Sequence, residues 1–375
     1  MALNWLENGF ICRNLCSLFV VKMDNEYLPD LENRYNTLLK QAEVAGADGD
    51  SLRVLEEYEH SVLESLYCYY RADISGSNEI IENLLRGVGS DPLASGPLSE
   101  SMAFPGAKGS EIQFFRSRKG DPSCSYIEKD MLHLPRSLRA KTGNYRFSIP
   151  GNPSFYLSNS SYGCWIETGF PPENEFNVAP VILDEALKVF NLAVSVRNHA
   201  HLDGFGAARV QCWLKLLVLM IATSYRVEET GRLFKSEYVV SQAIMVACKK
   251  MGYDGVAYLS KRVPNEAFSY CAINLALFVE YEEEYSSVAR RVKLGKPLNY
   301  SVFKQLKPSL RYKSYELRSV NNALVVNMGD FDRQHPYRET EFYDYDVFLF
   351  SEWKDRGCGK EKDVVSMGNA VPHER

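Results

Sequence analysis

Residues 145–167 read YRFSIPGNPSFYLSNSSYGCWIE. Proline fixes φ and glycine accepts positive φ, so the PGNP sequence at 150–153 predicts a turn between two extended segments. Ser154–Leu157 is short and aromatic enough to form a strand. Ser158–Ser161 offers N-cap oxygens for a helix over Tyr162–Glu167. We therefore expect a turn, a strand and a short helix arranged around one cleft.

Three side chains of this stretch suit a ligand that carries a phosphate, a flat ring and a sugar. Arg146 supplies a fixed fork of donors for phosphate, and Tyr156 supplies a ring face for stacking. Glu167 supplies an acceptor for ribose hydroxyls and a negative charge that can stabilise a developing oxocarbenium ion. One arginine, one tyrosine and one glutamate are also ordinary composition for a run of this length, so spacing alone favours a purely structural role.

The blocks on either side resemble those of the RES domain family, which is named for its arginine, glutamate and serine. They are FRSR at 115–118, similar to the family's opening strand, MLHLP at 131–135, EYVVSQ at 237–242, similar to a family helix start, and GVAYLS at 255–260, similar to a family strand. The resemblance covers roughly residues 111–280, with the blocks in the family's order. Ser241 stands where the family often has proline, which affects a helix start more than chemistry.

The mixture of short strands and helices predicts an α+β domain. The resemblance implies more: an ADP-ribosyltransferase-like fold, in which a split mixed or antiparallel sheet with surrounding helices clasps NAD+ in a central cleft. It implies a cytoplasmic toxin or defence effector that cleaves the nicotinamide N-glycosidic bond of NAD+, with water or inorganic phosphate as acceptor. It also implies an antitoxin or other regulatory partner, a homodimer, and no need for a metal.

The resemblance assigns roles to three residues. Glu167 would stabilise the charge that develops on the ribose and hold a ribose hydroxyl, while Tyr156 would stack near the nicotinamide or the ribose. Ser260 stands at the family's serine position. We expect Ser260 to orient the ligand or Glu167, because the sequence offers no His and Asp arrangement for a serine nucleophile.

Four arginines are the candidates for the anionic part of NAD+. Arg146 and Arg116 are expected to bind the pyrophosphate or an incoming phosphate as bidentate forks. Arg118 and Arg262 are second-line candidates for the same groups.

Two alternatives remain open from the sequence. An enzyme with the same cleft could transfer ADP-ribose to a macromolecule instead of to water or phosphate. The fold could also serve as an inactive NAD-binding or interaction module, with the N-terminal helices as its working surface. The joint presence of Arg146, Tyr156, Glu167 and Ser260 argues against the inactive module, because an idle site has no chemical need for all four.

Composition and charge describe an ordinary globular chain. Of the 375 residues, 45% are hydrophobic and 24% are charged, which leaves ample material for a core. The formal net charge is −5 and the isoelectric point is near 5.8. A protein that binds a phosphate backbone normally carries a basic face, so we expect no nucleic-acid partner.

The remaining chemical motifs are weak. Nine cysteines without a CxxC pair indicate a reducing, cytosolic setting. Cys164 lies in the central stretch, but no nearby histidine could activate it, so we expect it to serve packing. His199 and His201 form an HxH pair that no second cluster completes as a metal site. The glycines at 204–206 lack the spacing of a dinucleotide fingerprint.

The first residues are apolar, but Glu7 and Arg13 interrupt them and no small-residue cleavage pattern follows. We therefore expect neither a signal peptide nor a membrane span, and the folded part to begin near Met23. Either Met1 or Met23 could be the start. The expected organisation is a leader or extension at 1–22, a helical N-terminal unit at 23–88, a linker at 89–110, the RES domain at 111–353 and a disordered tail at 354–375.

Hydrophobic periodicity places the other elements. Helices are expected around 31–42, 55–70 and 80–85, the last capped by Ser77 and Asn78 and ended by Gly87, and then over 181–197, 205–227 and 237–250. Strands are expected at 255–260, 272–279, 323–327 and 344–350.

Overall fold

A computed structural model describes residues 27–101, 103, 112–121, 123–194, 206–227, 231–262, 272–280, 291–307, 337 and 340–353. The expected leader at 1–22, the strand at 323–327, the histidine pair at 199 and 201 and the tail at 354–375 lie outside these residues. No helix among the described residues is long and apolar enough to cross a membrane.

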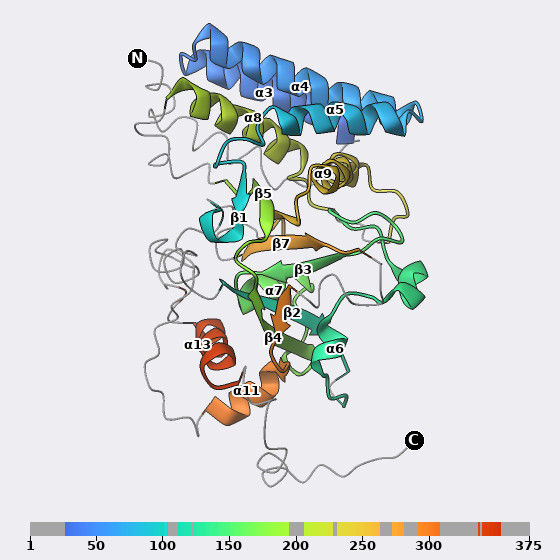
Figure 1. Cartoon of the computed structure of the whole chain (residues 1–375), viewed down its shortest axis with the longest axis vertical. Helices are drawn as coiled ribbons and strands as arrows, with labels where there is room; N and C mark the ends of the chain where they lie inside the picture. The colour runs from blue at the N-terminus through green and yellow to red at the C-terminus, as the bar shows by residue number, and fades with distance from the viewer. Residues whose placement is uncertain are drawn as a thin grey trace.

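Three helices open the described chain, as the periodicity predicts (Figure 1). They are α3 over Tyr27–Val44, α4 over Gly49–Tyr70 and α5 over Ile74–Arg86. Asp48 caps α4 by accepting a hydrogen bond from the Ser51 amide at 2.7 Å. The predicted Ser77 and Asn78 cap of α5 is wrong, because Asp73 accepts from the Gly76 amide instead and starts the helix one turn earlier. Gly87 ends α5 as predicted.

Nine strands within the described residues form one mixed sheet, which confirms the α+β class. They are β1 Ser95–Pro97, β2 Ile112–Lys119, β3 Ser154–Ser158, β4 Phe176–Leu183, β5 Lys188–Leu192, β6 Gly255–Leu259, β7 Ile273–Phe278, β8 Val292–Leu294 and β9 Leu298–Asn299. The order is β1-β5-β6-β7-β3-β2-β4-β8, with β9 also on β4. β5 and β6 run parallel, and the other pairs are antiparallel. Strand β1 falls inside the segment expected as a linker.

The sheet is nearly divided at its centre. β2 and β3 share only the pair Phe115↔Ser158, whereas β2 and β4 pair along eight positions from Ile112 to Lys119. Beyond that single contact the two strands diverge, so the sheet opens between one half built on β3 and β7 and another built on β2 and β4. The opening lies beside the helix that follows β3.

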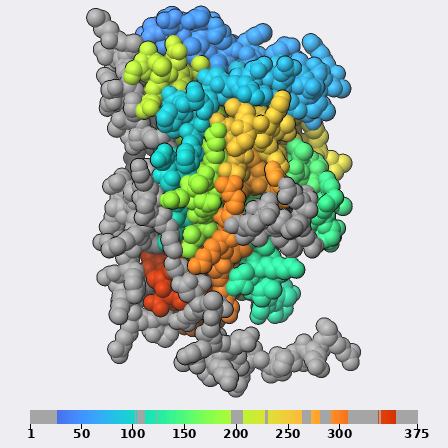
Figure 2. Space-filling view, viewed as in Figure 1, coloured from blue at the N-terminus to red at the C-terminus, as the bar shows by residue number. Residues whose placement is uncertain are grey.

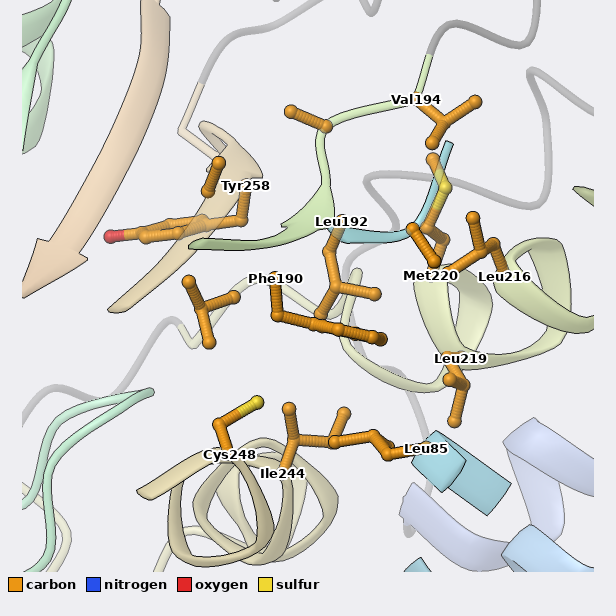
Figure 3. Packing of buried hydrophobic residues seen from close by; sticks show 14 of the residues in the cluster. Leu85, Phe190, Leu192, Val194, Leu216, Leu219, Met220, Ile244, Cys248 and Tyr258 are labelled. Atoms are coloured by element: carbon orange, nitrogen blue, oxygen red, sulfur yellow. The ribbon is translucent and has the colours of Figure 1, made fainter. Parts of the chain in front are cut away.

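One hydrophobic core joins the N-terminal helices to the sheet. Two further helices, α8 over Ala207–Ala222 and α9 over Val239–Lys250, lie between them. Figure 3 shows Leu85 of α5, Phe190 of β5 and Ile244 of α9 in one cluster with side chains of α8. On the face drawn in Figure 2, the blue N-terminal helices pack directly against yellow-green α8. Burial of one such Leu, Ile or Phe side chain stabilises the fold by about 1.5–3 kcal/mol.

Two of the expected elements are wrong. The helix expected over 181–197 is the end of β4 and the whole of β5, joined by a turn. Both strands are buried on both faces, and such a continuous apolar run cannot be distinguished from a buried helix by periodicity. The strand expected at 344–350 is helix α13, Glu341–Phe348, which continues as a π-helical turn to Trp353 and is capped by Thr340.

Candidate active site

A cavity of about 260 Å³ lies where the sheet opens. Its lining comes from β2, β3, β6, β7, the turn before β3, and α7 (Ser161–Glu167), the short helix that follows β3. The described lining holds five cationic side chains and one carboxylate: Arg116, Arg146, Arg226, Lys261 and Arg262 against Glu167. In a chain of net charge −5, this concentration of positive charge favours an anionic ligand.

Glu167 is the last residue of α7, and its carboxylate is held at one oxygen. Ser160 caps this helix as predicted, by accepting from the Gly163 amide at 2.9 Å. The Oε1 atom of Glu167 accepts hydrogen bonds from Ser260 Oγ at 2.5 Å and from Asn274 Nδ2 at 2.7 Å. Its Oε2 atom lies 3.7 Å from Arg262 Nε. One oxygen is therefore anchored, and the other lies beside a cation at the cavity.

Ser260 stands directly after β6 and is fully buried. Its amide donates to the carbonyl of Ala272 at 2.9 Å, which fixes the backbone next to β7. Its hydroxyl bonds Glu167 and does not itself line the cavity. The structure thus brings Ser260 into contact with Glu167, and an orienting role for this serine stays a prediction.

Asn274 is a site residue that the sequence reading missed. It lies on β7, is 2% exposed, and stands directly opposite Ser158 of β3 and Tyr258 of β6 in the sheet. Its side-chain amide is the second donor to Glu167 Oε1. A single asparagine inside the apolar run Ala272–Val279 was the available signal, because a polar side chain in a buried strand needs a partner.

Tyrosine rings form much of the cavity wall. The hydroxyl of Tyr156 is turned toward the preceding turn, where it bonds Ser148 Oγ at 2.8 Å and accepts from the Phe147 amide at 3.1 Å. Burial raises its pKa, so the phenol stays neutral. Its ring packs 6.2 Å from that of Tyr145, and both rings line the cavity. The ring of Tyr156 therefore borders the cavity, while its hydroxyl has structural partners.

Two further tyrosines of the lining lie within the sequence blocks that carry the family resemblance. Tyr238 precedes α9, and its ring lies 5.2 Å from the guanidinium carbon of Arg146. Tyr258 of β6 packs beside the core cluster, and Figure 3 shows its hydroxyl pointing away from the other labelled side chains. Burial raises the pKa of both phenols.

Arg146 lines the cavity, and two backbone carbonyls hold its guanidinium by hydrogen bonds. It donates one hydrogen bond to the carbonyl of Thr223 and another, at 2.5 Å, to the carbonyl of Tyr225. Both acceptors follow the C-terminal end of α8. Only 8% of Arg146 is exposed, so its position is set by the backbone that it binds.

Arg116 of β2 is held in the same manner. Its Nε donates to the Met131 carbonyl at 3.1 Å, and its Nη1 donates to the Tyr156 carbonyl at 2.7 Å. Burial, followed by the nearby Arg118, lowers the pKa of Arg116 to about 10, which still leaves it charged at neutral pH. Arg118 donates to the Leu132 carbonyl at 2.6 Å and does not line the cavity. The block at 131–135 thus supplies carbonyls that hold these arginines.

Of the seven residues expected at the site, the structure places five on the cavity lining: Arg116, Arg146, Tyr156, Glu167 and Arg262.

Cys164 also lines the cavity, but burial raises the pKa of its thiol to about 12, and Sγ contacts the Phe115 carbonyl at 3.4 Å. The thiol is therefore protonated and packed. No group of three or more His, Cys, Asp or Glu side chains in the described ranges could hold a metal ion.

The fold and site define an α+β protein with a cationic, tyrosine-lined cavity around one anchored glutamate. The RES domain family model matches residues 121–300 of the chain. β2, which carries Arg116 and Arg118, immediately precedes the matched residues.

Two known proteins are similar to this chain. A curated relative, "Putative toxin YopC" of Bacillus subtilis (strain 168), is 27% identical over 254 residues, which are 63% of this chain and 56% of the relative. The chain thus spans a little over half the length of that relative. A solved structure, "Crystal structure of the M.tuberculosis MbcT-MbcA toxin-antitoxin complex", is 12% identical and covers 60% of this chain and 98% of the solved chain, with a TM-score of 0.31.

Proposed function

We propose that this protein is a toxin that destroys NAD+ by cleaving the bond between nicotinamide and ribose, with water or inorganic phosphate as the acceptor. The observation that carries the proposal is the Glu167 carboxylate, anchored at one oxygen by Ser260 and Asn274 inside a cavity lined by five cations. The match to the RES domain family model and the relative described as a putative toxin support the proposal of a toxin.

The reaction needs what these residues provide. When the C1′–N bond breaks, its electron pair neutralises the positive ring nitrogen of nicotinamide, so the leaving group needs no proton. Positive charge then develops on the ribose, and a fixed carboxylate beside it lowers the barrier. An oxygen of water or phosphate bonds to C1′, and a proton is released to solvent. Glu167 has the fixed charge for this step, and its Oε2 atom, beside Arg262, can also hold a ribose hydroxyl.

The arginines and tyrosines of the lining suit the diphosphate, the nicotinamide ring and the ribose of NAD+. Arg146 and Arg116 each present a guanidinium with a fixed plane, which suits a diphosphate. Arg262, beside Glu167, can bind the phosphate nearer the reacting ribose or an incoming phosphate. Tyr156, Tyr238 and Tyr258 offer ring faces for nicotinamide and ribose. NAD+ is cytoplasmic, so a toxin of this kind acts there and needs an antitoxin in the cell that makes it.

The test is NAD+ consumption by the purified protein, with and without inorganic phosphate, with products identified by mass. We expect free nicotinamide together with ADP-ribose, or with a phosphorylated ADP-ribose if phosphate is the acceptor. Label from NAD+ that ends on a macromolecule would replace the proposal with ADP-ribosyl transfer. Tight NAD+ binding without turnover, in a protein that melts cooperatively, would replace it with a binding module.

Asn274→Ala is expected to lower NAD+ turnover by about tenfold to a hundredfold, because a hydrogen bond to a charged group is worth about 1.5–3 kcal/mol. The loss should fall on kcat rather than KM, since Asn274 acts through Glu167. Asn191→Ala is the matched control, because Asn191 is an equally buried asparagine on β5 that bonds the Leu93 carbonyl at 2.9 Å, away from the cavity. Equal losses in both variants would contradict a role at the site.

A further inference from the structure

The C-terminal end of α8 forms a cradle for Arg146. The last carbonyls of a helix have no partners within the helix and carry the negative end of its dipole. Arg146 donates to two carbonyls just beyond this end, those of Thr223 and Tyr225. Both acceptors are backbone atoms, so the guanidinium can only lie where the segment 223–225 places it.

That segment is held in turn by α3, the first described helix. The hydroxyl of Tyr27 donates to the carbonyl of Ala222, the last residue of α8, at 2.7 Å. Its ring meets the ring of Tyr225 edge-on, with centroids 4.7 Å apart. The guanidinium of Arg34, two turns further along α3, lies 4.7 Å from the centroid of Tyr225. Tyr27 and Tyr225 are each 1% exposed.

We propose that α3 is a positioning element of the active site, and that Tyr27 holds Arg146 in place through the carbonyls at the end of α8. The proposal rests on the proposed function for its effect on turnover. It assigns a task to the N-terminal helices, which lie at the opposite end of the molecule from α11 (Tyr300–Leu306) and α13 (Figure 1). These helices are then a condition for activity, because undocking α3 releases the cradle and with it the arginine.

The size of the effect follows from geometry. Removing the Tyr27 hydroxyl leaves the Ala222 carbonyl buried without this donor and lets the segment after α8 shift. A misplacement of about 1 Å at a substrate-binding group can cost about a hundredfold in rate. For Tyr27→Phe, which keeps the ring contact with Tyr225, we expect a loss of about tenfold in kcat/KM.

Tyr35→Phe provides a matched control. Tyr35 lies on the same helix, is also buried, and donates to a carbonyl of the same partner helix, that of Val218, at 3.1 Å. Both substitutions therefore remove one buried hydrogen bond between α3 and α8, and because the Val218 carbonyl keeps its partner within α8, Tyr35→Phe should lower the melting temperature by no more than Tyr27→Phe does. Only Tyr27 bonds the end of α8 that carries the cradle.

The first readout does not depend on catalysis. The full-length wild type and both variants are treated with phenylglyoxal, which modifies accessible arginines, and the modification of Arg146 is followed by peptide mass spectrometry. We expect Arg146 to react several-fold faster in Tyr27→Phe than in the wild type, and at the wild-type rate in Tyr35→Phe. Equal rates in all three proteins would overturn the proposal.

The second readout is a double-mutant cycle on NAD+ turnover with Arg146→Lys, since lysine lacks the planar fork with which arginine bonds the two carbonyls. If Tyr27 acts through Arg146, the double variant should be no slower than Arg146→Lys alone, whereas fully additive losses would overturn the proposal. A wild type that consumes no NAD+ but shows the expected phenylglyoxal pattern would overturn the proposed reaction and leave the positioning role supported.

Discussion

Glu167→Gln is expected to lower NAD+ turnover by about a hundredfold or more, because it removes the negative charge that stabilises the developing ribose cation. The substitution keeps the shape of the side chain. A glutamine carbonyl oxygen can still accept from Ser260 and Asn274, as Oε1 does now. Its amide nitrogen then replaces Oε2 beside Arg262, so the charge is lost while the anchoring is kept. The measurement is the initial rate of nicotinamide release, followed by mass.

Glu173→Gln is the control, because Glu173 is the next glutamate along the chain and its carboxylate pairs with Lys304 at 2.9 Å, outside the cavity. It should keep the wild-type rate within about twofold, as is usual for an exposed ion pair. The dissociation constant for NAD+, measured by calorimetry, should change little in Glu167→Gln. A Glu167→Gln protein that keeps more than about a tenth of the wild-type rate would contradict a role for this charge in the chemical step.

The central stretch was predictable because its signals are local. Gly151 has φ of +82° in the turn after Pro150, a conformation that glycine adopts without steric cost. Ser160 occupies the N-cap, and Ser154–Ser158 is the strand. These elements bring Arg146, Tyr156 and Glu167 to one cavity, as the turn, strand and helix pattern implies.

The partners of these residues were not predictable in the same way. The acceptors that hold Arg146 and Arg116 are backbone carbonyls, which every residue carries and no sequence pattern marks. Asn274 reaches Glu167 only because β7 pairs with both β3 and β6, a contact across more than a hundred residues. Local patterns thus located the side chains that line the cavity, whereas tertiary structure decides how they are oriented.

The structure of the C-terminal helix α13 was likewise not predictable from local sequence patterns. The aromatic run at 344–350 predicted a strand, but its residues pack as α13 and the following π-helical turn against β2, β4 and α7. Asp346 of α13 accepts from the amide of Ser161, the first residue of α7, at 3.1 Å, and from the Tyr337 hydroxyl at 2.7 Å. A carboxylate in the core of this late helix therefore supports the helix that carries Glu167.

Asp346→Asn is expected to stabilise the protein above pH 7. Burial raises the pKa of Asp346 from its ordinary 3.8 to about 7, although its hydrogen bonds from Ser161 and Tyr337 oppose this rise. Between about pH 4 and pH 7 the unfolded chain releases this proton and the folded protein retains it, so the free energy of unfolding of the wild type should fall as the pH rises through that window. A pKa that differs by one between the folded and unfolded states changes the free energy of unfolding by about 1.4 kcal/mol, so a rise from 3.8 to about 7 makes the gain in the variant on the order of 4 kcal/mol at pH 8.

The asparagine keeps an oxygen for the Ser161 amide and places a donor beside the Tyr337 hydroxyl, so the support of α7 survives. Urea unfolding at about pH 4.5 and about pH 8 measures the effect, which should be small at the lower pH and large at the higher. Asp344→Asn, two residues earlier on α13, is the control: Asp344 is half-buried and pairs with Lys307 at 2.7 Å, so its loss should not stabilise the protein at either pH. An Asp346→Asn variant that is less stable than the wild type at the higher pH would show instead that the ionised carboxylate is needed to hold α7 against α13.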